Sequence, residues 1–235
     1  MLTMLHNSAG SYHFLGQPGR PFSGGVAADA DFDIVHATFG RPVSLHDGIA
    51  AAVEHVTRQG RPVLAIAGFE LRIPAPFSRA GFEEFNKRYI DKLIEVGLTV
   101  DGLMPAARTN VSPEVGAPKA PSVYAVSYTI NEPGQKSRFV ISGAAEGVKG
   151  NPTARLDSII EQLTASMSRL GVSWADASAI QLYGMDFSPA AVVQSILRPL
   201  AGGAVHGIRW FPSHPPIDDV TLEVDVRSAS KELII

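Results

Sequence analysis

The chain has 235 residues and contains no cysteine. That absence excludes disulfides, thiolate metal sites, iron–sulfur clusters and cysteine nucleophiles. An excess of positive charge is also lacking, because 20 Lys and Arg residues stand against 23 Asp and Glu residues, a net charge of −3. We therefore expect no nucleic-acid partner, since such proteins normally carry a basic surface. The chain has no long apolar run, so no membrane span is predicted.

Targeting and cofactor motifs are equally scarce. The first basic residue is Arg20, too late for the charged start of a secretory signal, so a cytoplasmic location is expected. The phosphate-loop, dinucleotide, serine-elbow and zinc-protease motifs are missing, and we expect no cofactor. No metal site is expected either, because His206 and His214 lack a nearby third ligand. The remaining histidines considered are interpreted as surface or core-edge residues: His13, His36, His46 and His55.

What the chain does contain is a pattern of short strands alternating with amphipathic helices. Apolar residues make up 45% of it, enough for a globular core. Ser44, Ser78 and Asn151-Pro152 each precede a helical apolar stripe and predict helix starts. A further short helix is predicted after Ser188-Pro189. Strands are predicted at 11–15, 32–39, 62–71, 103–111, 122–130, 138–144, 177–185, 204–211 and 220–226.

From residue 32 onward, these elements give the order β-α-β-α-β-β twice. The turn signal Asn-Glu-Pro-Gly, between Asn131 and Ser137, separates the two halves. We therefore expect an α/β fold with two tandem domains, residues 1–131 and residues 132–235.

Residues suited to chemistry lie on the last two predicted strands. In 220–226 the apolar residues alternate with Thr221, Glu223 and Asp225, so the carboxylates should lie on the face away from the helices. If the two strands formed a hairpin, Arg209 would approach Glu223. Such a pair can bind a carboxylate and activate a water. The alternative is a structural ion pair at a subunit interface.

The first half places an arginine, Arg108, on the corresponding strand. The strand that follows it carries hydroxyl groups and Tyr124 but no carboxylate. One half therefore offers an arginine with an acid, whereas the other offers an arginine alone.

Several short segments accompany this order of elements. They are Phe-Glu-Glu-Phe-Asn-Lys-Arg-Tyr at 82–89, Pro-Ala-Ala-Arg-Thr-Asn-Val at 105–111, Phe-Val-Ile-Ser-Gly at 139–143, Leu-Gly-Val at 170–172, Trp-Ala-Asp at 174–176 and Leu-Glu-Val-Asp at 222–225. Together with the element order, and over about residues 32–228, these segments resemble the RidA/YjgF family of enamine/imine deaminases.

The resemblance implies a chorismate-mutase-like fold, a homo-oligomer that is usually trimeric, and cofactor-independent hydrolysis of a small enamine or imine carboxylate. It implies that Arg209 binds the carboxylate and that Glu223 positions the water. By the same resemblance, Ser142 and Gly143 line the site, Arg108 is the first-half arginine, and Tyr128 lies near a site tyrosine.

Departures from the family pattern leave other functions open. Trp210 follows Arg209 where the family has a small residue, which predicts a larger, more aromatic pocket. Chorismate-hydrolysing enzymes are longer relatives of the same fold, so a cyclic or aromatic carboxylate is an alternative substrate. A third possibility is a non-catalytic small-molecule binder, in which Arg209 pairs with Glu223 and fills the cleft.

Overall fold

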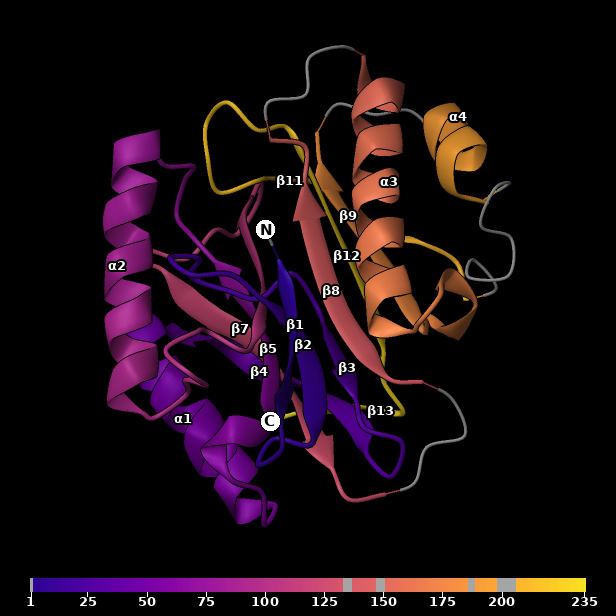
Figure 1. The fold of residues 1–235 in the computed structure, drawn as a ribbon. Coiled ribbons are helices and arrows are strands. Elements are labelled where there is room, and N and C mark those ends of the chain that lie inside the picture. Colours follow the sequence, from indigo (N-terminus) through magenta and orange to yellow (C-terminus); the bar gives the residue numbers. More distant parts are fainter. Residues whose placement is uncertain (1, 133–136, 147–150, 186–188, 198–205) are drawn as a thin grey trace.

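The protein is built of four layers, with two β-sheets between two layers of helices. The computed structural model describes residues 2–132, 137–146, 151–185, 189–197 and 206–235. Helices α1 (Leu45–Arg58) and α2 (Arg79–Glu95) cover one outer face. Helices α3 (Pro152–Leu170) and α4 (Pro189–Val192, continued by a π-helical turn at Val193–Leu197) cover the other, as Figure 1 shows. The sheets face each other between them.

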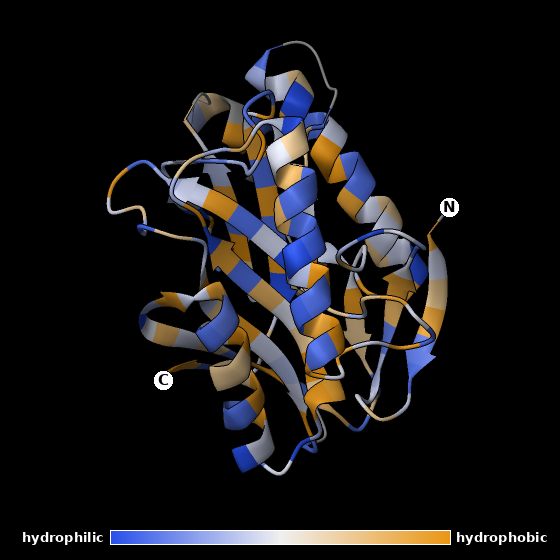
Figure 2. Ribbon diagram, turned by 90° about the vertical axis from the view of Figure 1, so that its left-hand side faces the viewer, coloured by the Kyte–Doolittle hydropathy of each residue, from blue (hydrophilic) through white to orange (hydrophobic). Residues whose placement is uncertain are grey.

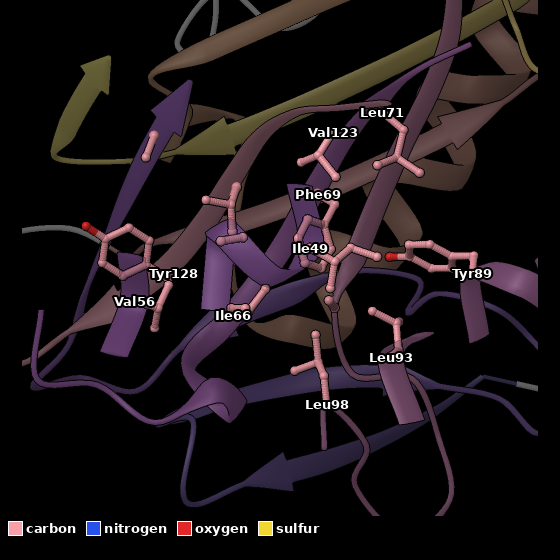
Figure 3. Packing of buried hydrophobic residues seen from close by; sticks show 14 of the residues in the cluster. Ile49, Val56, Ile66, Phe69, Leu71, Tyr89, Leu93, Leu98, Val123 and Tyr128 are labelled. Carbon is pink, nitrogen blue, oxygen red and sulfur yellow. The ribbon is translucent and has the colours of Figure 1, made fainter. Parts of the chain in front are cut away.

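The first sheet has six strands in the order β11-β6-β5-β7-β4-β13. It packs against α1 and α2 through the core drawn in Figure 3, a buried cluster to which α1 contributes Ile49 and Val56, α2 contributes Tyr89 and Leu93, and the sheet contributes Phe69. Its strands are β4 (Asp33–Ser44), β5 (Ile66–Arg72), β6 (Ala107–Pro113), β7 (Ser122–Ile130), β11 (Ser213–His214) and β13 (Lys231–Ile234). A 3-10 turn at Val63–Ala65 precedes β5.

The second sheet has seven strands in the order β1-β2-β3-β8-β12-β9-β10. It packs against α3 through Ile141, Leu163 and Val224. Its strands are β1 (Thr3–Asn7), β2 (Tyr12–Gly16), β3 (Val26–Ala28), β8 (Phe139–Ala144), β9 (Ala179–Gly184), β10 (Arg209–Phe211) and β12 (Leu222–Ser228). A 3-10 turn at Trp174–Asp176 precedes β9.

The helices begin and end where local sequence dictates. The hydroxyl oxygens of Ser44 and Ser78 accept backbone N–H bonds in the first turns of α1 and α2, as does the amide oxygen of Asn151 in α3. Gly171 ends α3 with a φ of 70°, in the left-handed region that favours glycine. Along the helices facing the viewer in Figure 2, hydrophilic and hydrophobic stretches alternate, as expected for elements with one buried side. None of the described helices is long and apolar enough to cross a membrane.

The two halves share one connectivity. Within the first sheet, β4-β7-β5-β6 repeats the arrangement of β8-β12-β9-β10 in the second. In each group the first and third strands flank an antiparallel partner, and the third and fourth strands run parallel. This equivalence supports the predicted tandem organisation, which stays a proposal.

Several strands nevertheless belong to the sheet of the other half. β1, β2 and β3 precede the predicted boundary at residue 131 but belong to the second-half sheet, whereas β11 and β13 follow it and belong to the first-half sheet. Residues 133–136 of the boundary lie outside the described part of the chain. The strand predicted at 11–15 is β2, which pairs with β1 on one side and with β3 on the other.

The expected hairpin of the last two strands does not form. β9 lies between β10 and β12, and β10 runs parallel to β9. The strand predicted at 204–211 is described only from Arg209 to Phe211, residues 204 and 205 being outside the described chain. After Pro212 the chain enters β11, which pairs with β6 of the other sheet.

Buried polar side chains occupy much of the space between the sheets. Burial favours a raised pKa for Glu70, but His36 and two nearby guanidinium groups lower it to about 2. These groups belong to Arg72, 3.0 Å from Glu70, and Arg227, 3.2 Å away. Gln181 also donates to Glu70, over 3.2 Å. The sheets are therefore joined by charge-assisted hydrogen bonds as well as by apolar contacts.

Candidate active site

A cleft of about 460 Å³ opens where the two sheets and the N-terminal segment meet. Its walls come from β6, β8, β12, α2 and α3, and from the segment between β2 and β3. Among the described residues, its lining includes three arginines and two glutamates but no histidine, so it offers no set of imidazole metal ligands.

Arg108 of β6 lies at the inner end of this cleft and is 4% exposed. One guanidinium nitrogen donates to Oδ1 of Asn86, 2.8 Å away. Four aromatic rings surround the guanidinium carbon, with centroids 4.6 Å (Phe22), 4.9 Å (Tyr89), 5.5 Å (Phe82) and 5.7 Å (Phe85) away. These cation–π contacts hold the group in one place without neutralising its charge.

Arg108 keeps that charge although it is buried. Burial lowers the pKa of its guanidinium to about 10, so the group remains protonated at neutral pH. Within the described chain, no carboxylate forms an ion pair with it. An unpaired buried cation is costly, and a site that keeps one is suited to binding an anion.

Glu223 of β12 lines the same cleft and is 5% exposed. Burial raises the pKa of its carboxyl group to about 8, and nearby Asp225 also raises it. The backbone N–H of Asn110 donates to Oε1 over 3.1 Å. At neutral pH the side chain is thus mainly a neutral acid that can give up a proton and take one back.

Asn110, Ser142 and Gly143 complete the inner wall of the cleft. Both side-chain amide atoms of Asn110 are buried without a hydrogen-bond partner in the described structure. Ser142 Oγ donates to the backbone carbonyl of Arg108 over 2.7 Å and joins the two sheets at the cleft. At Gly143 a side chain would come within 3.2 Å of Leu163, so glycine allows α3 to approach β8 closely.

A second guanidinium group lies near the first. The Arg20 guanidinium carbon lies 5.1 Å from the Phe22 ring centroid, on the ring that Arg108 also contacts. The charge of Arg20 contributes to the lowered pKa of Arg108, which places the two cations within electrostatic reach. Arg169 of α3 lines the same cleft, and its guanidinium donates to the carbonyl of Leu2.

The structure brings together only some of the residues predicted from sequence. Arg108, Ser142, Gly143 and Glu223 all line the cleft. Arg209 does not approach Glu223, because β9 separates their strands; it is 52% exposed and lies 3.4 Å from Glu232. The filled cleft with an Arg209–Glu223 pair, expected of a non-catalytic binder, is therefore absent from the described structure.

The predicted aromatic residues lie elsewhere. Trp210 is 47% exposed on the edge strand β10 and donates to the carbonyl of Gly184 over 2.9 Å. Tyr128 is buried in the core against α1, with its hydroxyl 3.0 Å from Nε2 of His55 (Figure 3). Neither lines the cleft. Aromatic rings of Phe22 and Phe82 take that place.

Sequence reasoning missed Arg20, Phe22, Asn86 and Asn110. A signal for Asn86 was available, since the spacing Phe-x-x-x-Asn-x-x-Tyr at 82–89 surrounds Arg108 in the folded chain. From the sequence, the aromatic residues Phe82, Phe85 and Tyr89 are interpreted as helix core. Phe85 and Tyr89 do belong to the buried core, but all three rings also contact the Arg108 guanidinium. For Arg20 no signal exists, because it lies in a glycine- and proline-rich connection.

The fold is related to that of chorismatase. A solved chorismatase superposes with a TM-score of 0.51 at 14% identity, over 88% of this chain and 77% of that one. A solved cyanuric acid hydrolase gives a TM-score of 0.39 at 10% identity, over 85% and 69% of the two chains, too low to inform the fold further. The chain is thus an α/β protein of chorismatase-like architecture, with its cleft between two sheets.

Residues 4–233 match the family described as 2-aminomuconate deaminase CnbZ, and the chain belongs to this family. A 2-amino-5-chloromuconate deaminase of Comamonas testosteroni is 30% identical over an alignment of 247 positions that covers 97% of each chain. The RidA/YjgF membership expected from short segments is therefore wrong. In this chain, those segments lie on strands, on helices and at the buried arginine of the cleft.

Proposed function

We propose that the protein hydrolytically deaminates a small unsaturated 2-amino dicarboxylate of the 2-aminomuconate type, giving a 2-oxo acid and ammonia. The family and its 30% identical relative support the reaction type. The cleft supports the substrate class, because it combines buried arginine, aromatic walls and a neutral acid. This reaction needs no oxidant or reductant.

Arg108 binds the carboxylate next to the amino-bearing carbon. Asn86 occupies one of its nitrogens, so the rest of the guanidinium fork can donate to both carboxylate oxygens. The planar chain of conjugated double bonds then lies between the rings of Phe22 and Phe82. The second carboxylate reaches Arg20, which relieves the repulsion between the two guanidinium groups.

Glu223 performs the proton transfers. As a neutral acid it protonates a carbon of the enamine, and the double-bond electrons shift so that the carbon bearing nitrogen becomes an iminium ion. The Glu223 carboxylate then takes a proton from water, whose oxygen bonds to that carbon. In the resulting carbinolamine the same acid protonates nitrogen. The C–N bond breaks, ammonia leaves, and the hydroxyl proton returns to Glu223 as the carbonyl forms.

The buried Arg108, which lines the same cleft as buried Glu223 and forms no ion pair with a carboxylate of the described residues, is the observation that carries this proposal. Its test measures ammonia release and the loss of diene absorbance with 2-aminomuconate prepared immediately before use. Arg108→Met keeps the aliphatic stem and removes the charge. We expect kcat/KM to fall by about 100-fold or more, because a hydrogen bond to a charged group is worth roughly 1.5–3 kcal/mol and substrate alignment is also lost.

Arg209→Met is the matched comparison, since Arg209 occupies the equivalent strand of the other half. The geometry predicts nearly unchanged kcat/KM for this variant. Loss of activity in Arg209→Met alone would contradict the assignment and restore the sequence-based choice of Arg209. Tight binding of the substrate by the wild-type protein without ammonia release would overturn the deaminase proposal in favour of a binding protein.

A further inference from the structure

Three potential metal ligands gather outside the cleft, on the N-terminal strands. His6 of β1 and His13 of β2 are cross-strand partners, and Asp29 follows β3. Their ligand atoms all lie within 4.8 Å of one another. The antiparallel pairing of β1 with β2 and of β2 with β3 brings the three residues together.

The local geometry leaves both imidazoles facing one carboxylate. Nε2 of His6 lies 3.0 Å from Oδ2 of Asp29, and Nδ1 of His13 lies 3.1 Å from Oδ1. The two rings stack with centroids 4.4 Å apart and an interplanar angle of 26°. Although Oδ1 is buried, it has no hydrogen-bond partner, because the His13 contact lacks hydrogen-bond geometry. His6 is thus hydrogen-bonded to Oδ2 of Asp29, whereas the buried Oδ1 faces the His13 ring without a hydrogen bond.

We propose that His6, His13 and Asp29 bind a divalent transition-metal ion of the Zn²⁺ class. Two neutral imidazole nitrogens and one carboxylate oxygen form a donor set that suits Zn²⁺ and disfavours Mg²⁺ or Ca²⁺, which prefer oxygen ligands. Side-chain exposures of 46% for His6 and 44% for His13 give the ion access from solvent and leave room for water in the remaining coordination positions.

Such an ion would fasten β1, β2 and the end of β3 to one another. The connection between β2 and β3 carries Arg20 and Phe22 into the cleft. The bound metal thus stabilises the scaffold of one cleft wall and takes no part in the proposed reaction. The site is independent of the proposed deaminase function.

The test uses the untagged full-length chain after chelator treatment and dialysis. Calorimetric titration with ZnCl₂ at neutral pH should give saturable binding of about one ion per chain, and the melting temperature should rise with Zn²⁺. His6→Asn and Asp29→Asn should each weaken binding by about tenfold or more, because even losing an outer-shell partner of a metal ligand costs that much.

His214→Asn is the matched control. His214 is 44% exposed and pairs with Glu114 over 2.9 Å, but it is not part of the three-residue group, so its loss should leave Zn²⁺ binding unchanged. Circular dichroism of the metal-free variants checks that they remain folded. Absence of saturable binding in the wild type, or undiminished binding in folded His6→Asn and Asp29→Asn variants, would overturn the site.

Discussion

Glu223 couples the stability of the protein to pH. Burial raises the pKa of its carboxyl group from an ordinary 4.5 to about 8, so between these values the folded chain holds a proton that the unfolded chain has lost. This bound proton stabilises the folded state. Its full contribution to the free energy of unfolding is present below pH 4.5, decreases by about 1.4 kcal/mol per pH unit above that value, and is lost as the pH rises through 8.

Glu223→Gln should remove this dependence, because the amide imitates the neutral acid and its oxygen can still accept the N–H of Asn110. We expect the variant to gain stability relative to wild type as the pH increases from 5 to 9. Urea denaturation across that range measures the difference. A constant difference between the two proteins would show that Glu223 does not titrate in this way.

The same carboxyl group should set the alkaline limb of catalysis. Protonation of the enamine requires neutral Glu223, so kcat/KM should decrease above an apparent pKa near 8. A pH–rate profile with a dicarboxylate substrate measures this limb. If kcat/KM instead increased through that range, Glu223 would act first as a base, and the proposed order of proton transfers would be wrong.

Arg20 should discriminate between dicarboxylates and monocarboxylates. Removing its charge in Arg20→Met leaves Arg108 to bind the first carboxylate alone. We expect KM for a 2-aminomuconate-type substrate to rise about tenfold, because a charge-assisted hydrogen bond is lost. An imine of a monocarboxylic 2-amino acid, generated in the assay, should show little change. Equal effects on both substrates would place Arg20 outside the specificity site.

At the scale of elements, capping residues and periodicity predict what local sequence controls. The helix starts at Ser44, Ser78 and Asn151 are confirmed, as is the strand at 122–130. Strands β1, β3, β11 and β13 could not be predicted, because they are only two to five residues long and are held by pairing with distant strands. Short strands carry little period-two signal of their own.

The start of α3 provides a quantitative check of this local control. Oδ1 of Asn151 accepts the N–H of Ala154 over 2.9 Å. Asn151→Ala should destabilise the protein by about 1 kcal/mol, whereas Asn151→Ser should retain most of the stability, since serine also caps helices. Chemical denaturation of the three proteins measures the difference. Equal stability of the alanine variant would mean that the cap contributes nothing here.

At the scale of the whole molecule, the cleft combines residues from both halves. Arg108 comes from a strand before the predicted boundary, and Glu223 from a strand after it. Sequence spacing led to the pairing of Arg209 with Glu223, because neighbours along the chain are the simplest partners. The packing of one sheet on the other instead places Arg108 in the cleft that Glu223 lines, and no local sequence pattern predicts that packing. The predicted homotrimer accompanied the RidA resemblance and stays an untested prediction.

This packing should make the two halves unfold together. Glu70 of β5 contacts Arg227 and Gln181 of the other sheet, and Asp33 of β4 lies 2.7 Å from Arg138. Separating the sheets would break these charge-assisted hydrogen bonds, and the strands β1, β2, β3, β11 and β13 tie each sheet to the other half of the chain. We therefore expect one cooperative transition although each sheet has its own apolar core.

Tryptophan fluorescence and circular dichroism can distinguish the two outcomes. Both tryptophans, Trp174 and Trp210, lie after the predicted boundary, and Trp174 is buried in the core under α3. Their fluorescence therefore follows the second half, whereas the far-ultraviolet signal also follows the 14-residue α1 and the 17-residue α2 of the first. In urea the two signals should give the same midpoint and slope. Separate midpoints would show that the halves fold as independent domains, each stable without the interface that forms the cleft.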